Sequence, residues 1–172
     1  MESVRQPLYT HPGVLFPNLM PACKQRVAVA CKLEDAFEYV ADWKNLKNFL
    51  PMFVSISPTT VVQYGPGASF DILLSIAKTE ISTSMDVVEF FKNRRIVMKS
   101  SRGIRMKLVM EFKDVGGKVL VTFEMEYDIP PGLIVRGANE SEAIAKDLEA
   151  TGCKSMELLK WTLESLPPSM DE

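Results

Sequence analysis

From Phe53 onward the sequence alternates between apolar and polar residues, and this pattern continues for about 75 residues. A first run, Val61–Tyr64, leads into the turn signal Gly65-Pro66-Gly67, and later runs are separated by Lys92-Asn93 and Gly116-Gly117. Successive strands joined by short turns form an antiparallel meander with one apolar and one solvated face. The alternation therefore predicts a sheet for the middle of the chain.

The alternation also predicts which side chains face the apolar side of this sheet. The inward positions are Phe70, Ile72, Leu74, Ile76, Ile81, Thr83, Met85, Val87, Ile96, Met98, Ser100, Ile104, Met106, Leu108, Met110, Phe112, Val119, Val121, Phe123, Met125 and Tyr127. On the opposite, solvent-facing register lie the acids Asp71, Asp86, Glu111, Glu124, Glu126 and Asp128. A shift of one residue would turn these acids inward, but it would expose the apolar partners. The predicted interior therefore contains almost no titratable group.

Helical patterns flank the alternating region. Before it, Gln25–Lys32 is predicted as a strand, Leu33–Trp43 as a helix and Asn45–Leu50 as a second short helix that Pro51 ends. After it, a long helix is predicted from about Asn139 to about Leu166. Its apolar stripe consists of Ile144, Leu148, Gly152, Met156, Leu159, Leu163 and Leu166. A helix with one apolar stripe and a sheet with one apolar face are expected to pack together.

The charge balance and the proline distribution bound the remaining possibilities. The 172 residues carry 20 basic and 22 acidic side chains, so the net charge of −2 offers no basic surplus for nucleic acid. No apolar run approaches the roughly 18 residues of a membrane helix, and residues 1–20 contain three prolines instead of a signal-peptide core. We expect a cytoplasmic protein with an extended arm at 1–24, one domain at 25–166 and a tail at 167–172.

The order of elements and several local motifs resemble one superfamily. Asp35–Trp43, followed by Leu46, Phe49, Leu50 and Pro51, is similar to its opening helix pair. Gly65-Pro66-Gly67 stands where its second strand turns to the third, and Gly116-Gly117 resembles its last hairpin. The superfamily is the START-like, or Bet v 1-like (SRPBCC), superfamily, in particular its polyketide cyclase/dehydrase and coenzyme-Q-binding branch. The resemblance covers Gln25 to about Leu166.

This resemblance implies an α+β helix-grip fold, in which a curved antiparallel sheet of about seven strands wraps a long C-terminal helix. It also implies a deep cavity between that sheet and that helix. Members of the superfamily bind lipids, quinones, sterols, hormones or polyketides in this cavity. A minority catalyse cyclisation or dehydration.

Motifs for covalent or metal chemistry are not found. His11 is the one histidine, and there is no HxxH, HExxH or cysteine cluster, so we expect no metal and no cofactor. No phosphate-binding glycine loop occurs, and no histidine in the domain can activate a serine or cysteine nucleophile. No catalytic residue is predicted. The cysteines, Cys23, Cys31 and Cys153, are interpreted as small buried residues with a structural role.

The candidate ligand-binding set combines the inward sheet positions with two helical residues and one residue at the expected mouth. It comprises Trp43, Phe70, Ile72, Leu74, Thr83, Met85, Met98, Ser100, Met106, Leu108, Met110, Phe123, Met125, Tyr127, Met156 and Leu159. Methionine is flexible and suits a surface that adapts to a variable partner, although a solid core is the alternative. With the resemblance, the pattern favours an apolar pocket of several hundred Å³. Thr83, Ser100 and Tyr127 either orient a ligand or satisfy backbone groups.

Three functions follow as hypotheses. The first is binding or transport of a hydrophobic small molecule, such as a lipid, quinone or polyketide. The second is a polyketide cyclase or dehydratase that uses the same cavity, with Tyr127 or Thr83 assisting proton transfer. The third is a protein-interaction module built on Trp161, which lies off the apolar stripe and faces either the N-terminal arm (Leu15, Phe16, Leu19) or a second copy in a homodimer.

Overall fold

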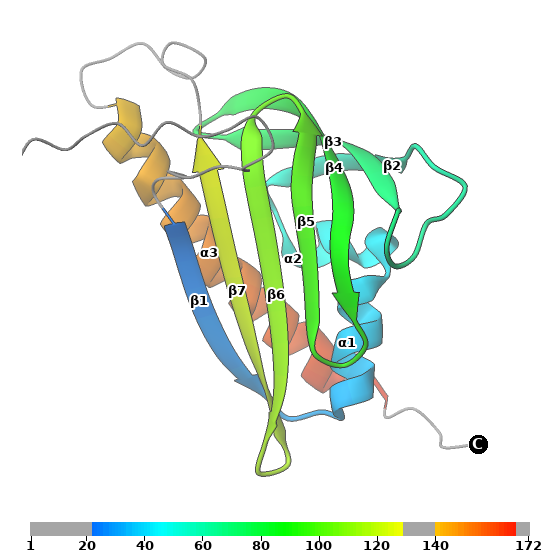
Figure 1. The fold of residues 1–172 in the computed structure, drawn as a ribbon. Coiled ribbons are helices and arrows are strands. Elements are labelled where there is room, and N and C mark those ends of the chain that lie inside the picture. Colours follow the sequence, from blue (N-terminus) through cyan, green and yellow to red (C-terminus); the bar gives the residue numbers. More distant parts are fainter. Residues whose placement is uncertain (1–21, 129–139, 168–172) are drawn as a thin grey trace, which may run out of the picture.

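The computed structural model describes residues 22–128 and 140–167, with side chains from 23–128 and 142–167. Its elements are β1 (Ala22–Val29), α1 (Leu33–Ala41), the 3-10 turn η1 (Trp43–Asn45), α2 (Leu46–Phe49), β2 (Phe53–Pro58), β3 (Ser69–Ile76), β4 (Thr79–Phe91), β5 (Arg95–Arg102), β6 (Arg105–Val115), β7 (Lys118–Asp128) and α3 (Glu140–Ser165). The strands form one antiparallel sheet in the order β1-β7-β6-β5-β4-β3-β2. This sheet curves around α3, while α1 and α2 lie between its two ends (Figure 1). The predicted α+β helix-grip fold is confirmed.

The boundaries differ from the prediction at the N-terminal side of the domain. Strand β1 begins at Ala22, three residues before the predicted start at Gln25, because its pairing with β7 extends to Glu126. Helix α1 ends at Ala41, where the Asp42 carboxylate accepts a hydrogen bond from the Lys44 backbone N–H at 3.0 Å. That bond caps η1 and separates α1 from α2. The predicted arm lies outside the described residues up to residue 21.

The predicted strand Val61–Tyr64 is wrong, because this segment is an irregular loop between β2 and β3. The Thr60 hydroxyl donates to the Val62 carbonyl at 2.7 Å and accepts from the Ser69 backbone N–H at 3.0 Å. These local bonds replace a sheet ladder. Val61 is fully exposed, so no neighbouring strand gains from covering it.

The alternation of β3 to β7 is confirmed by burial. The side chains of Leu74, Met85, Met106 and Met125 have no exposed surface. The turn from β3 to β4 carries no glycine: it consists of Ala77 and Lys78, both with positive φ. The Asp147 carboxylate of α3 accepts a hydrogen bond from the Ala77 backbone N–H at 2.9 Å, so the helix supports this turn.

Helix α3 packs its apolar stripe on the sheet as the pattern predicts. Buried on this stripe are Ile144, Leu148, Met156, Leu159 and Leu163. Leu166 is exposed, in contrast to the prediction, because it lies beyond the last helical residue. At the same end of the helix, the Lys160 ammonium donates to the Ala28 carbonyl at 2.8 Å, and the Glu164 carboxylate accepts from the Ala30 backbone N–H at 3.0 Å.

Helix α3 approaches the sheet closely at Gly152. A Cβ atom at this position would lie 2.6 Å from the Cys23 Sγ and 3.3 Å from the Gln25 Cγ. The Cys23 thiol itself donates to the Leu148 carbonyl at 3.6 Å. Glycine inside a helix usually costs stability, but here the absence of a side chain lets the helix lie against β1.

We predict that Gly152→Ala lowers the free energy of unfolding by about 1–2 kcal/mol, because overpacking against Cys23 outweighs the gain in helix propensity. Cys23→Ala in the same chain removes the Sγ atom, so the Gly152→Ala change should then cost less than about 0.5 kcal/mol. Urea unfolding of the two single variants and the double variant measures this coupling. Equal costs in both backgrounds would contradict the close approach.

Candidate ligand site

An apolar pocket lies between the short helices and the middle strands of the sheet. Its lining residues are Val40, Ala41, Trp43, Leu46, Phe49, Leu50, Gln63, Gly65, Phe70, Val87, Phe90, Ile96, Met98, Leu108 and Met110. Helices α1 and α2 form one wall, strands β3 to β6 form the other, and the β2–β3 loop contributes Gln63 and Gly65. The pocket thus faces α1 and α2, whereas the prediction placed it against α3.

Part of the predicted ligand-binding set meets at this pocket, namely Trp43, Phe70, Met98, Leu108 and Met110. The other predicted residues do not line it. Buried in the core are Ile72, Leu74, Thr83, Met85, Met106, Phe123, Met125, Tyr127, Met156 and Leu159, while Ser100 is partly exposed. The prediction missed the helix wall (Val40, Leu46, Phe49, Leu50), although the apolar spacing of the helix pair marks these residues as inward-facing.

The pocket is smaller than the several hundred Å³ that the prediction expects. Its volume is about 40 Å³, which is room for a few water molecules at about 10–15 Å³ each. The fully buried methionines Met85, Met106 and Met125 fill space in the core of the domain. A drug-sized molecule therefore enters this pocket only if the lining side chains or the β2–β3 loop move.

Polar atoms of the pocket lie at its rim. The Trp43 indole N–H donates to the Gln63 side-chain carbonyl at 3.3 Å, and the Trp43 ring lies 6.0 Å from the Phe70 ring centroid. Tyr64, next in the same loop, donates its hydroxyl to Glu38 Oε2 at 2.8 Å and places its ring edge-on to Phe90 at 4.9 Å. Burial, the hydrogen bond to Glu38 and its charge raise the pKa of Tyr64 to about 12, so this hydroxyl stays protonated at neutral pH.

The three inward polar residues of the prediction have different roles. Thr83 donates its hydroxyl to the Arg102 carbonyl at 2.8 Å, and the Ser100 hydroxyl accepts from the Met106 backbone N–H at 2.9 Å. These two residues satisfy backbone groups where β5 turns into β6. Tyr127 is only 3% exposed, and its hydroxyl has no hydrogen-bond partner within the described part of the chain. Burial raises the pKa of Tyr127 to about 12, with a smaller contribution from the Cys23 thiol, so the phenol is neutral and can donate.

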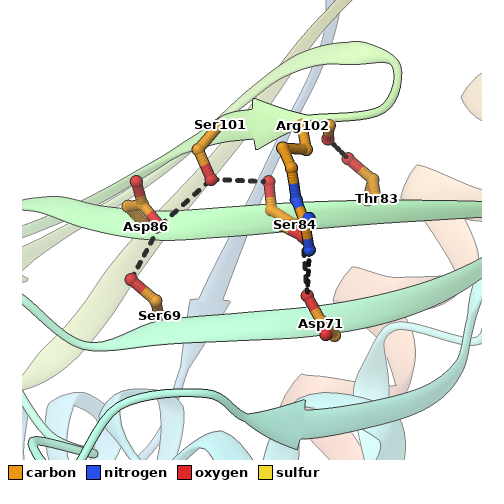
Figure 2. Close-up of polar contacts among 7 residues, drawn as sticks. All are labelled: Ser69, Asp71, Thr83, Ser84, Asp86, Ser101 and Arg102. Carbon is orange, nitrogen blue, oxygen red and sulfur yellow. Dashed lines mark hydrogen bonds and ion pairs between the residues drawn. The ribbon is translucent and has the colours of Figure 1, made fainter.

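The acids of the sheet are paired on its outer face, as the register predicts. Figure 2 shows Ser84 donating to Asp71 and Ser69 donating to Asp86, at 2.6 Å and 2.7 Å. Arg102 lies 3.9 Å from Asp71 on the same face. No charged side chain is among the described residues that line the apolar pocket. Within residues 22–128 and 140–167, no three His, Cys, Asp or Glu side chains are grouped as metal ligands.

The cysteines are not all buried. Cys23 is buried and Cys31 is partly buried, and burial raises the pKa of both thiols, which disfavours the reactive thiolate. Cys153 is exposed, so its interpretation as a buried residue is wrong: it lies beside Gly152 but off the apolar stripe. None of the helices in the described part of the chain is long and apolar enough to cross a bilayer.

Comparisons with known proteins identify the fold. No protein-family model matches the sequence, and no curated protein gives a significant match. Among solved structures, TTHA0849 from Thermus thermophilus superposes with a TM-score of 0.70 at 14% identity, over 83% of this chain and 97% of that one. The ZhuI aromatase/cyclase from Streptomyces sp. R1128 gives 0.65 at 12% identity, over 84% and 93%. A START superfamily protein from Mycobacterium smegmatis gives 0.60 at 13% identity, over 83% and 94%.

These similarities, together with the sheet order and the long C-terminal helix, define the fold as START-like (Bet v 1-like). The fold prediction from the sequence is therefore confirmed. At these identities the likeness concerns the fold alone.

We predict that Tyr127→Phe leaves the free energy of unfolding equal or raises it by up to about 1 kcal/mol, because it removes a buried hydroxyl for which residues 22–128 and 140–167 provide no partner. Thr83→Val is the matched control: it removes a hydroxyl that has a partner and should cost about 1–2 kcal/mol. Urea unfolding at neutral pH compares the two. A larger loss for Tyr127→Phe would reveal a partner of this hydroxyl.

Proposed function

We propose that this protein binds a hydrophobic small molecule in the apolar pocket between α1, α2 and strands β3 to β6. The observation that carries the proposal is the lining: its walls are apolar, and its hydrogen-bonding side chains, Trp43 and Gln63, lie at the rim. Such a lining is typical of small-molecule sites, which combine apolar walls with a few polar groups. The likeness in fold to a START superfamily protein and to an aromatase/cyclase supports the same class of ligand.

Binding depends on how the pocket enlarges. Met98 and Met110 lie on neighbouring strands and both line it. Their unbranched side chains have several accessible rotamers and can give way to a ligand more easily than leucine or valine. Burial of about 200 Å² of apolar ligand surface contributes about 5 kcal/mol at about 25 cal/mol per Å². Part of this free energy offsets the displacement of the wall, so affinity should rise with the length of the apolar body.

Met110→Glu tests the pocket directly. We expect it to weaken binding of the apolar fluorescent probe N-phenyl-1-naphthylamine at least tenfold, because it places a charge in an apolar wall. Fluorescence titration measures the affinity.

Lys113→Glu is the control for the charge change, since Lys113 lies exposed on the same strand β6. Met110→Leu is the second control, because it changes the same side chain but keeps the wall apolar, so it should bind the probe. Circular dichroism checks that each variant is folded. Similar losses of affinity in Met110→Glu and Lys113→Glu would remove the pocket as the binding site.

A second candidate function is a cyclase or dehydratase. The observation in its favour is Tyr127, whose buried and neutral hydroxyl has no hydrogen-bond partner among the described residues. It could donate a hydrogen bond or a proton to a substrate carbonyl only in an enlarged pocket, because Tyr127 does not line the present one. Against it stands the lack of a general base: the described lining of the pocket contains no carboxylate and no imidazole. Proton abstraction needs such a group near the reacting carbon.

The cyclase hypothesis is tested by incubating the wild type and Tyr127→Phe with a poly-β-ketone thioester. We expect no cyclised product above the rate without protein in either case, because a base is missing. Chromatography coupled to mass spectrometry detects the products. Product formation by the wild type that is lost in Tyr127→Phe, with retained affinity, would establish the enzyme instead.

One structural observation supports the third hypothesis, a protein-interaction module. Trp161 is 70% exposed on α3 and faces away from the sheet, as its position off the stripe predicts. The arm residues Leu15, Phe16 and Leu19 lie outside the described residues. A cover for Trp161, whether the arm or a second copy, therefore stays a prediction, as do the division at 24 and 25 and the cytoplasmic location.

A further inference from the structure

The rim of the pocket carries hydrogen-bonding side chains, whereas its walls are apolar. The Trp43 indole N–H and the Gln63 carboxamide are the hydrogen-bonding side-chain groups among its described lining residues. They bond to each other at 3.3 Å, near the long end of the range for an N–H···O bond. Gln63 is exposed and Trp43 partly exposed, so water competes for this bond. A ligand with a polar end can replace it at low cost.

One part of the pocket wall is neither helix nor strand, namely the β2–β3 loop, residues 59–68. Strands β3 to β6 are held in register by their neighbours on both sides. The loop presents Gln63 and Gly65 to the pocket, while Val61 and Val62 on its other side are exposed. Gly65 and Gly67 have positive φ on either side of Pro66, so the loop returns to β3 through residues with wide backbone freedom.

Few side-chain contacts hold this loop against the body. The two ends of the loop are fixed to the strands, because the Thr59 and Gly67 backbone N–H groups donate to the Ser69 and Val87 carbonyls and the Thr60 hydroxyl accepts from the Ser69 backbone N–H. Between these ends, the Trp43–Gln63 bond and two contacts of Tyr64, its hydroxyl bond to Glu38 and its ring contact with Phe90, hold the loop. The Tyr64 bond to Glu38 is exposed. A pocket of about 40 Å³ accepts a ligand only if its lining side chains or this loop move, and the two exposed hydrogen bonds are contacts that the loop can release to water.

We propose that the ligand is a neutral amphiphile with one polar end, and that residues 61–66 are the gate through which it passes. The apolar body occupies the space between α2 and β4 to β6. The polar end, a hydroxyl, carbonyl or amide group, takes the place of Gln63 as the acceptor for the Trp43 indole N–H. This inference rests on the proposed function and adds to it the class of ligand and the residue that selects it.

The lining favours a neutral polar end over a charged one. Neither a basic nor an acidic side chain is among its described residues. Glu38, the charged residue that the gate contacts, is engaged by Tyr64 and lies 3.6 Å from the Lys92 ammonium. A carboxylate or ammonium at the rim would therefore find no opposite charge among the described lining residues, and the nearby Glu38 and Lys92 already pair with each other.

The experiment compares two ligands of equal length, 1-decanol and 1-chlorodecane, as competitors of N-phenyl-1-naphthylamine. The quantity to compare between variants is the ratio of the two Kd values. The two ligands differ in how favourably they leave water, but this difference is the same for all variants and cancels when the ratios are compared. Trp43→Phe should lower the preference for decanol about fivefold, since it removes the donor and keeps an aromatic ring. Trp161→Phe, the same substitution on exposed α3, should leave the ratio unchanged.

The gate is tested by the rate of association. Tyr64→Phe removes the hydroxyl contact to Glu38 and keeps the ring on Phe90, so the probe should bind several-fold faster in stopped-flow mixing while the Kd ratio stays as in the wild type. Tyr39→Phe is the matched control, because the Tyr39 hydroxyl accepts a hydrogen bond from Asn48 and does not touch the loop. An unchanged rate in Tyr64→Phe would overturn the gate.

The outcomes separate this inference from the function on which it rests. If the wild type does not bind the probe, the proposed function itself fails. If the probe binds and Met110→Glu abolishes binding, but Trp43→Phe and Trp161→Phe give the wild-type ratio, the function stands and the ligand class is wrong. Gln63→Leu, at an exposed position that should not affect folding, lowers the preference for decanol over chlorodecane if Gln63 also binds the polar end. If Gln63→Leu lowers this preference while Trp43→Phe leaves it unchanged, Gln63 selects the ligand and the proposed role of Trp43 is wrong.

Discussion

The burial of one helix against one curved sheet is the interaction on which the structure depends. Helix α3 presents a single apolar stripe, and Gly152 lets it approach β1 to the limit that the Cys23 sulfur allows. A seven-stranded sheet is wider than one helix can cover. Helices α1 and α2 therefore cover the remaining apolar surface of strands β3 to β6. The pocket lies at this second contact, where short helices and a loop close the surface less completely than α3 does.

The sequence predicts this fold well because its main signal is local. Alternation along β3 to β7 assigns Met85, Met106 and Met125 to the interior, and their complete burial agrees. Where the pattern of alternation predicts the local structure wrongly or not at all, a tertiary contact or a local hydrogen bond determines that structure. The segment at 61–64 has strand-like residues, but the Thr60 hydroxyl bonds hold it as a loop. The Ala77-Lys78 turn has no glycine signal and is supported by Asp147 from a distant helix.

The candidate site was harder to predict than the fold. Alternation tells which side of the sheet a residue faces, but it does not tell which element covers it. Met110 and Met125 have the same pattern, yet Met110 lines the pocket while Met125 lies fully buried in the core. At the rim, Trp43 is among the predicted residues but Gln63 is missed, because Gln63 belongs to a segment predicted as a strand. Its contact with Trp43 joins residues 20 positions apart through the loop.

The small volume of the pocket follows from the same energetics that make the fold stable. An apolar cavity of about 300 Å³ would cost about 7 kcal/mol at about 24 cal/mol per Å³, which is comparable to the whole stability of many domains, about 5–15 kcal/mol. Permanent space of that size would therefore strongly destabilise a domain built on one helix. Methionine side chains such as Met98 and Met110 fill this space at little cost in packing, and they can open it for a ligand by changing rotamers. With its acids paired on the outer face, such an interior is suited to holding apolar molecules of variable shape more than to moving protons.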